Sequence, residues 1–308
     1  MRILLTGGTG MVGSAFNRIE TKHEIIGVGS KQYDLKDFSV VDKMLSDIRP
    51  DAIIHLAARV GGVKGNRDYV ADFYSENIRM NTNILELAYK HNISKVLSLL
   101  STCIYPDKAT YPLTEDQIHT GKPHPSNFGY AYAKRMLDVH SRALREQHGC
   151  DFICAVPNNI YGINDYFDLE KCHVIPAIMR KIWEAKKTGI SPVFWGDGTP
   201  LREFTYSEDV ARILMKLLEE YSSPDPINIC SSNEVSISQV VEMIADNMNY
   251  DGEIIWDTSK PSGQFRKPSS NEKFLDFVGG EFDYTSLQDG LRITCEWFKS
   301  EYPNLRGI

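Results

Sequence analysis

The feature that most constrains this chain is a glycine-rich turn set between a short apolar run and a helical pattern. The apolar run occupies residues 2–6, and the turn TGGTGMVG at 6–13 carries Gly7, Gly10 and Gly13 at three-residue spacing. Glycine permits a tight turn and lets the backbone approach a pyrophosphate, which the N-terminus of the following helix also favours. This order predicts a dinucleotide site at the end of the first strand.

The rest of the first half alternates apolar runs with helical patterns. Strands are expected at 2–6, 25–29, 52–56, 95–100 and 152–156, and helices at 11–20, 68–91 and 130–148. Strands rich in β-branched residues that alternate with helices predict an α/β fold, a Rossmann-type doubly wound parallel sheet covered on both faces.

Beyond about residue 159 the pattern changes, because prolines and aromatic residues become denser. We therefore expect a dinucleotide-binding domain over 1–160 and a smaller mixed α/β lobe over mainly 161–308. The boundary is approximate, and later parts of the chain can return to the first domain. Helices in this lobe are expected at 174–187, 208–220, 236–247 and 284–301.

Charge and cysteine usage narrow the possible partners. The 308 residues carry a net charge of −7 without a long run of either sign, whereas nucleic-acid binding usually needs a basic face. The apolar run before the glycine turn is too short for a signal peptide or a membrane span. The six cysteines are scattered without a Cys-x-x-Cys pair, which fits free thiols better than disulfides or a metal site. We expect a cytoplasmic protein with no nucleic-acid, membrane or metal partner.

The end of the second strand indicates which dinucleotide is used. An acidic residue there would bind the adenine ribose hydroxyls and repel a 2′-phosphate, but this chain has Ser30 and Lys31. The pair favours NADP, although Lys31 could equally be a solvated loop residue. Asp34 is expected near the adenine.

A second signal is the pair Tyr130 and Lys134, which lie one helical turn apart. The ammonium favours phenolate and is therefore expected to lower the pKa of the tyrosine toward neutrality. Ser101 follows strand 95–100 and could hydrogen-bond a substrate carbonyl, or simply cap a loop. Together with the glycine turn, these residues predict redox chemistry at a carbonyl.

Five further stretches carry a family resemblance: HLAARVGG at 55–62, STCIYP at 101–106, NFGYAYAK at 127–134, HVIP at 173–176 and WGDGTPLREF at 195–204. They resemble the GDP-L-fucose synthase family of the extended short-chain dehydrogenase/reductase superfamily. The resemblance implies conversion of GDP-4-keto-6-deoxy-D-mannose to GDP-L-fucose. The steps are epimerisation at C3 and C5 and NADPH-dependent reduction at C4, in a homodimer.

The resemblance also implies roles for individual residues. Each inversion needs one group to remove a proton and another to return one, and a cysteine and a histidine suit this near pH 7. Cys103 and His173 fill these roles, with the choice of base and acid left open. For reduction, Tyr130 protonates the oxyanion, Lys134 holds the nicotinamide ribose and Ser101 polarises the carbonyl.

The cofactor and substrate contacts implied by the resemblance cover both halves of the chain. In the segment beside the nicotinamide, Asn158 replaces the usual threonine. Arg202 is expected to pair with diphosphate oxygens and Trp195 to offer a ring face, the alternatives being solvated basic residues and a packed tryptophan. The expected cofactor contacts are Gly7, Gly8, Thr9, Gly10, Met11, Val12, Gly13, Ser30, Lys31, Asp34, Leu56, Ala57, Ala58, Leu99, Leu100, Lys134, Pro157, Asn158, Asn159, Ile160 and His173. The expected substrate contacts are Ser101, Thr102, Cys103, Asn159, Lys181, Trp195, Arg202 and Lys267, with Arg266 as a weaker candidate.

Two alternatives remain at this point. One is another nucleotide-sugar epimerase or dehydratase of the same fold; a 4,6-dehydratase would place an Asp-Glu pair where this chain has Cys103 and Ile104. The other is a non-catalytic NADP-binding regulatory protein, a class that tends to lose the Tyr/Lys pair found here.

Overall fold

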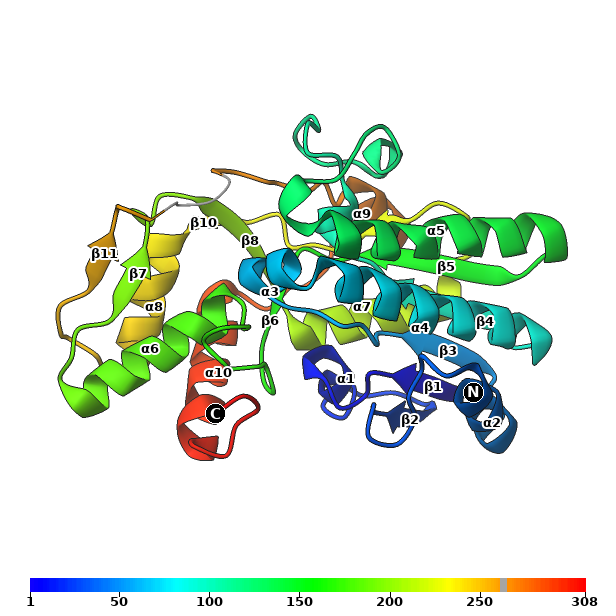
Figure 1. Ribbon diagram of the computed structural model, residues 1–308, viewed down its shortest axis with the longest axis horizontal. Helices are drawn as coiled ribbons and strands as arrows, with labels where there is room; N and C mark the ends of the chain where they lie inside the picture. The colour runs from blue at the N-terminus through cyan, green and yellow to red at the C-terminus, as the bar shows by residue number, and fades with distance from the viewer. Residues whose placement is uncertain (261–264) are drawn as a thin grey trace.

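A six-stranded parallel sheet forms the centre of the larger half of the molecule (Figure 1). The computed structural model describes residues 1–260 and 265–308. The strand order is β2-β1-β3-β4-β5-β9, and it reverses direction between β1 and β3, which opens a crevice at the carboxyl edge of the sheet. The predicted α/β fold is thus confirmed. The strands are β1 (Arg2–Thr6), β2 (Glu24–Val28), β3 (Ala52–His55), β4 (Lys95–Leu99), β5 (Asp151–Val156) and β9 (Ile227–Asn228).

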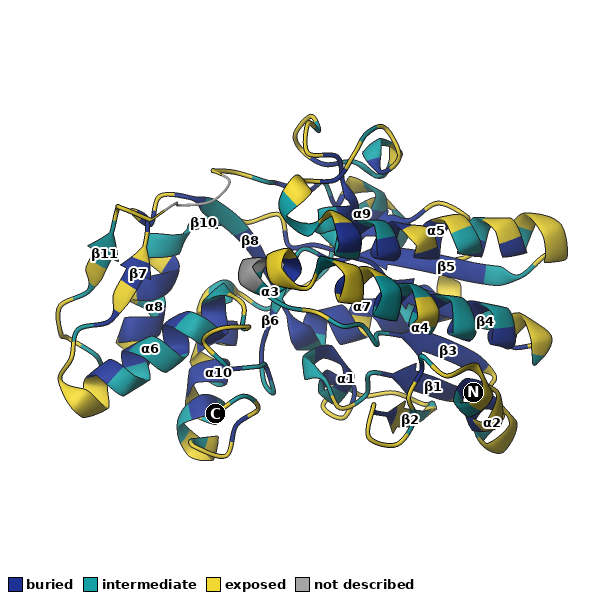
Figure 2. Cartoon of the chain, in the orientation of Figure 1, coloured by how far each residue is buried: buried dark blue, intermediate teal, exposed yellow. Residues whose placement is uncertain are grey.

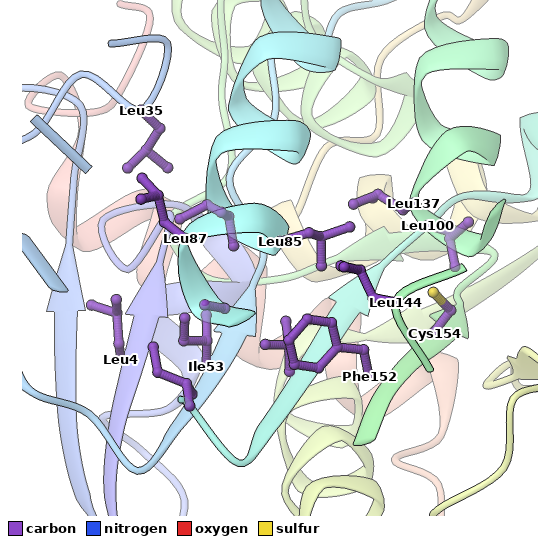
Figure 3. Close-up of a cluster of buried hydrophobic side chains, with 14 of the residues drawn as sticks. Leu4, Leu35, Ile53, Leu85, Leu87, Leu100, Leu137, Leu144, Phe152 and Cys154 are labelled. Carbon is purple, nitrogen blue, oxygen red and sulfur yellow. The ribbon is translucent and has the colours of Figure 1, made fainter. Parts of the chain in front are cut away.

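Helices cover both faces of this sheet. The helices are α1 (Met11–Ala15), α2 (Phe38–Ile48), α3 (Val63–Asp68), α4 (Val70–Lys90), α5 (Phe128–His148), α7 (Ser207–Glu220) and α9 (Glu272–Val278). Figure 3 shows one core, where strand residues such as Ile53 and Phe152 lie beneath Leu85 of α4 and Leu137 of α5. Burying each such side chain contributes about 1.5–3 kcal/mol. The opposite face packs against α1, α7 and α9.

The smaller lobe has its own core and its own strands. Its strands form the sheet β10-β8-β6 and the parallel pair β11-β7. Its core includes Met179, Ile244 and Phe298, each fully buried. Figure 2 shows buried residues on α6, α8 and α10, the helices of this lobe. The helices are α6 (Val174–Thr188), α8 (Ile237–Met248) and α10 (Leu287–Glu301). The strands are β6 (Asn159–Tyr161), β7 (Val193–Trp195), β8 (Leu201–Tyr206), β10 (Glu234–Ser236) and β11 (Ile255–Asp257). Short 3-10 turns are η1 (Thr102–Ile104), η2 (Glu115–Gln117) and η3 (Pro125–Asn127).

The chain returns to the first sheet after entering this lobe. Strand β9 pairs with β5, and Val210 and Leu214 of α7 share a core with Ile3 and Leu97. The larger half is therefore completed by residues well beyond 160.

Some predicted helices differ from the structure. The helix expected over 11–20 ends at Ala15, because Phe16 donates its N–H to the carbonyls of Gly13 and Ser14 and the chain turns. Helices α2, α3 and α9 were not predicted. Helix α2 carries a signal that the sequence analysis missed: Asp37 caps its N-terminus through Ser39 N, and Val41, Met44 and Leu45 bury one face.

Candidate active site

The glycine turn is held so tightly that side chains cannot fit at several positions. Gly7 has φ +73, and a Cβ on Gly8 would lie 2.6 Å from Gly27 Cα. A Cβ on Gly13 would lie 2.3 Å from the Gly7 carbonyl oxygen. Since contacts under 3.0 Å with backbone atoms cannot be relieved cheaply, these positions must be glycine, which leaves the backbone bare there for close approach to a pyrophosphate. These residues fit a dinucleotide.

Other predicted cofactor residues lie around this turn. Gly29, before Ser30 and Lys31, is so close to Thr9 that a Cβ there would lie 2.8 Å from the Thr9 side chain. Ser30, Lys31 and Asp34 are exposed, whereas Val12 and, in part, Met11 pack into the core. A Cβ on Gly7 would lie 2.9 Å from Ala57 N, which places the half-buried segment Leu56, Ala57 and Ala58 beside the turn.

Four of the predicted catalytic residues meet at the end of β4. Ser101 Oγ accepts hydrogen bonds from Cys103 N and from Cys103 Sγ, at 3.5 and 3.2 Å. Helix α5 brings Tyr130, whose pKa the Ser101 side chain influences, and Lys134, whose Nζ donates to the Leu99 carbonyl at 2.7 Å. Leu99 and Leu100 themselves are buried in the two cores that flank the sheet.

The electrostatics of this cluster correct one expectation. The predicted fall in the pKa of Tyr130 is wrong: burial raises this pKa well above the ordinary value, the charge on Cys103 raises it further, and the Ser101 hydrogen bond only partly opposes them. Burial also lowers the pKa of Lys134 to about 8. The four-residue spacing identifies the neighbouring ammonium but not the burial of the tyrosine. Burial removes water from the phenol and so disfavours the charged phenolate. Tyr130 is therefore a neutral phenol, a form that can donate a proton.

Cys103 and His173 have pKa values displaced in opposite directions. Burial raises the pKa of Cys103, while the Ser101 hydrogen bond and the charges of Lys267 and Lys134 oppose the rise. His173, the residue before α6, retains exposed surface, yet nearby protein atoms remove enough water to lower its pKa. Near neutral pH the histidine is then neutral and the cysteine largely a thiol.

The segment leading to His173 lies against the cofactor turn. Asn164, which has φ +67, donates from Nδ2 to the carbonyl of Thr9 at 3.2 Å. Further along, the backbone carbonyl of Lys171 accepts a hydrogen bond from Gly62 N at 3.1 Å. Sequence reasoning missed Asn164, because a single asparagine in a loop carries no signal of a partner so far away along the chain.

The segment expected beside the nicotinamide is fixed by side-chain hydrogen bonds. Asn158 accepts from Thr205 Oγ1 at 2.7 Å and donates to the Ser231 carbonyl at 3.1 Å. Asn159 donates to the Glu203 carbonyl at 2.9 Å, and the carbonyl of Pro157 accepts from Thr102 N at 3.3 Å. The asparagine at 158, where the family usually has threonine, is thus held by hydrogen bonds of its own side chain. Ile160 packs against the core.

The predicted substrate residues divide into two groups. Lys267 Nζ donates to the Thr102 carbonyl at 2.9 Å. Burial lowers the pKa of Lys267 and the charge of Arg202 lowers it further, so both cations face the same region. By contrast, Lys181 donates to the Val193 carbonyl at 2.8 Å, and Trp195 is 65% exposed on β7. No hydrogen bond or ion pair described for residues 1–260 and 265–308 links this second pair to the Cys103 turn.

Arg266 does not join the predicted substrate group. Its Nε donates to both carboxylate oxygens of Glu234, at 2.8 and 2.7 Å, so its charge is matched within the lobe. Glu203 is a further residue that the sequence analysis missed. It is 2% exposed, and burial raises its pKa to about 7.

The described residues contain neither a membrane-spanning helix nor a metal-binding cluster. No helix there is both long and apolar enough to cross a membrane. Within the same residues, no three histidine, cysteine or acidic side chains are grouped so that they could hold a metal ion.

Known proteins resemble this chain along its whole length. The model of the NAD dependent epimerase/dehydratase family matches residues 3–230. A GDP-L-fucose synthase of Dictyostelium discoideum is 40% identical over 311 residues, covering 99% of this chain and 97% of the relative. One of Sinorhizobium fredii is 40% identical over 302 residues, covering 97% and 96%. The crystal structure of a GDP-L-fucose synthetase from Naegleria fowleri bound to NADP has a TM-score of 0.93 and 40% identity, covering 99% of this chain and 96% of that one.

Proposed function

The chain belongs to the NAD dependent epimerase/dehydratase family, and from this premise we propose that it makes GDP-L-fucose. The reaction converts GDP-4-keto-6-deoxy-D-mannose by epimerisation at C3 and C5 and by NADPH-dependent reduction at C4, as the family resemblance led us to expect. Full-length relatives at 40% identity support this function. The observation that carries it is the clustering of Cys103 with Ser101, Tyr130 and Lys134, because a simple reductase needs no cysteine there.

The epimerase half depends on the acidity of the substrate. The 4-keto group acidifies the hydrogens on C3 and C5, so a side chain can remove each one and a second side chain can return a proton to the opposite face. We assign these two roles to Cys103 and His173. A neutral histidine can accept a proton and a thiol can donate one, and the two exchange these states over the cycle.

The reductase half depends on a proton donor at the carbonyl oxygen. NADPH, when bound, supplies the hydride that reduces C4. Tyr130, held as a neutral phenol by burial, donates its proton to the oxygen of C4, and Ser101 hydrogen-bonds the same oxygen. The buried ammonium of Lys134 stabilises the phenolate that remains after this transfer.

The remaining contacts are assigned by position. We assign the glycine turn to the pyrophosphate of the cofactor, and Ser30 and Lys31 to its 2′-phosphate. Asp34 is assigned to the adenine. The segments 56–58 and 157–160 are assigned to the two sides of the cofactor. Arg202 and Lys267 are two neighbouring cations that suit the oxygens of a sugar-nucleotide diphosphate. We assign Thr102, whose carbonyl accepts from Lys267, and Asn159 to the sugar, and Trp195 and Lys181 to a more distant part of the GDP-sugar.

The test is incubation of the purified enzyme with GDP-4-keto-6-deoxy-D-mannose and NADPH. We expect one equivalent of NADPH oxidised for each sugar and GDP-L-fucose as the product identified by NMR. An epimerase that recycles its cofactor, or a regulatory protein, would leave NADPH unoxidised, and a reductase without epimerase activity would yield a product that keeps the starting configuration at C3 and C5. Either result would refute the proposal.

We also propose a homodimer in the cytoplasm. Exposed apolar residues on α4 and α5, including Tyr74, Met136 and Val139, support an interface of these helices with a second copy. Six free cysteines support a reducing compartment. Sedimentation of the enzyme and of Met136→Glu tests the first point: the native chain should be dimeric and the variant monomeric.

A further inference from the structure

The segment 265–271 is fastened both to Glu203 in β8 of the smaller lobe and to Leu113 of the larger half. Ser269 N donates to both carboxylate oxygens of the buried Glu203, at 3.2 and 3.1 Å. On either side of this anchor, Leu113 N donates to the Pro268 carbonyl and Ser270 N donates to the Leu113 carbonyl, each at 2.9 Å. The backbone around residue 267 is therefore fixed by three sets of hydrogen bonds.

This fastening directs the Lys267 side chain onto the turn that contains Cys103. The Nζ of Lys267 donates to the carbonyl of Thr102 at 2.9 Å, across 165 positions of sequence. Thr102 precedes Cys103 in the 3-10 turn η1, so the ammonium is anchored one residue from the thiol. The charges that act on Lys267 are those of Cys103, Arg202 and Asp107.

We propose that Lys267, beyond its substrate contact, is a positioning residue for Cys103: it fixes the cysteine-bearing turn and stabilises negative charge on Sγ. The inference rests on the proposed function, in which Cys103 takes part in proton transfer at C3 and C5. Glu203 has a supporting role, because it holds the segment that carries the lysine.

Other groups also face the thiol and bear on its charge. Ser101 Oγ lies 3.2 Å from Cys103 Sγ, and helix α5 presents Tyr130, Lys134 and Arg135. Burial raises the pKa of Cys103, and among the charges that oppose this rise Lys267 has a larger effect than Lys134. Lys134 is 3% exposed and donates to the Leu99 carbonyl as part of the reductase group. Lys267, by contrast, is anchored on the cysteine turn itself, through the Thr102 carbonyl.

The reactivity of the thiol tests the proposal without any sugar substrate. Iodoacetamide alkylation of the Cys103 peptide is followed by mass spectrometry across pH in the native enzyme, Lys267→Met and Lys267→Arg. Removing a nearby positive charge typically shifts a pKa by about one unit or more, so alkylation at neutral pH should be roughly 10-fold slower in Lys267→Met. Lys267→Arg should restore most of the rate.

The neighbouring Arg266 gives a matched control. Its charge is paired with Glu234, so Arg266→Met should leave the alkylation profile of Cys103 unchanged. An unchanged profile in Lys267→Met, with weaker sugar-nucleotide binding alone, would reduce Lys267 to a diphosphate ligand and overturn the proposal. If Lys267→Met does not fold, as judged by circular dichroism, Lys267→Gln makes the same measurement.

Failure of this inference differs from failure of the proposed function. A native enzyme that makes GDP-L-fucose, with an unchanged alkylation profile in Lys267→Met, refutes only the role of the lysine. A native enzyme that exchanges no C3 or C5 hydrogen refutes the function, because Cys103 then has no proton-transfer role.

Discussion

The cofactor turn follows β1 and the cysteine turn follows β4, at the same edge of the sheet with β3 between them, but the two turns are built in different ways. The cofactor turn is one contiguous stretch, 6–13, whose glycines exclude side chains by backbone contact. The cysteine turn, 101–104, takes its chemistry from side chains that arrive from α5 and from the segment 265–271. The cofactor half of the site is therefore specified by a contiguous stretch of sequence, whereas the acid–base half depends on tertiary structure. Changes in the two regions should therefore have separable effects.

The largest expected effect separates epimerisation from cofactor binding. In Cys103→Ser, exchange of the C3 and C5 hydrogens with deuterated water should fall on the order of 100- to 10,000-fold, because a serine hydroxyl is too weak an acid. NADPH affinity should be unchanged, since the cofactor turn is intact. NMR measures the exchange, and Cys150→Ser, at the far end of α5, is the control. Near-native exchange in Cys103→Ser would make Cys103 a packing residue.

A similarly large effect is expected at the tyrosine, in the opposite half-reaction. Tyr130→Phe removes the proton donor, so reduction should fall on the order of 100- to 10,000-fold while C3 and C5 exchange continues. Tyr132→Phe is the matched control, because this ring packs against Arg135 rather than Ser101. Loss of both activities in a folded, NADPH-binding Tyr130→Phe enzyme would contradict the division of labour.

Glu203, which holds the segment 265–271, should make the free energy of unfolding depend on pH. Burial raises the pKa of Glu203 to about 7 from its ordinary value of 4.5. Between these values the native state holds a proton that the unfolded chain has lost, so the free energy of unfolding should fall as pH rises and level off above 7. The fall attributable to Glu203 is roughly 3 kcal/mol at most.

Urea unfolding of the native enzyme and Glu203→Gln across this range measures the effect. The variant should show a smaller slope, with the remainder supplied by Asp165, whose pKa burial also raises to about 7. Identical slopes in the two proteins would show that Glu203 does not hold its proton in the native state.

On the cofactor side, a methyl group should be enough to disturb the turn. Gly13→Ala places a Cβ 2.3 Å from a backbone oxygen, and overpacking of this kind costs about 1–3 kcal/mol, so NADPH affinity should fall about 10-fold or more. Gly27→Ala is the control, because its Cβ would lie 3.5 Å from the nearest atom. Titration of NADPH fluorescence gives both constants; equal affinities would contradict the tight-turn account.

The smallest expected effect concerns Lys31, an exposed side chain that we assign to the 2′-phosphate of the cofactor. Lys31→Glu should reduce the preference for NADPH over NADH by about 10-fold, because a carboxylate repels the 2′-phosphate. The measurement is kcat/KM with each cofactor, and Lys36→Glu is the control, since Lys36 is paired with Asp34 and Glu76. An unchanged preference would assign the 2′-phosphate to other residues.

The sequence predicted the parts of the molecule that are specified locally. The parallel sheet and the dinucleotide cofactor are confirmed, because strand–helix alternation and the glycine turn are short-range signals. The family and the function, which were predicted from the five stretches of family resemblance between residues 55 and 204, are also confirmed. The residue roles in the site remain predictions. The sign of the Tyr130 pKa shift was wrong, since burial outweighs the neighbouring ammonium.

The residues that sequence reasoning missed depend on contacts between distant segments. Asn164 reaches Thr9 across 155 positions, and Glu203 binds Ser269 across 66. Arg266 and Lys267 are adjacent and equally basic, yet one is paired with Glu234 and the other reaches the cysteine turn. No local pattern distinguishes these two residues, because the direction of each side chain is set by the fold of the whole segment.

The most direct test of the account is the position of solvent hydrogen in the product. The enzyme is incubated with GDP-4-keto-6-deoxy-D-mannose and NADPH in deuterated water, and the product is analysed by NMR. The account predicts GDP-L-fucose that carries deuterium at C3 and C5 and ordinary hydrogen, delivered as hydride, at C4. A reduced product with the starting configuration and no deuterium at C3 or C5 would contradict it.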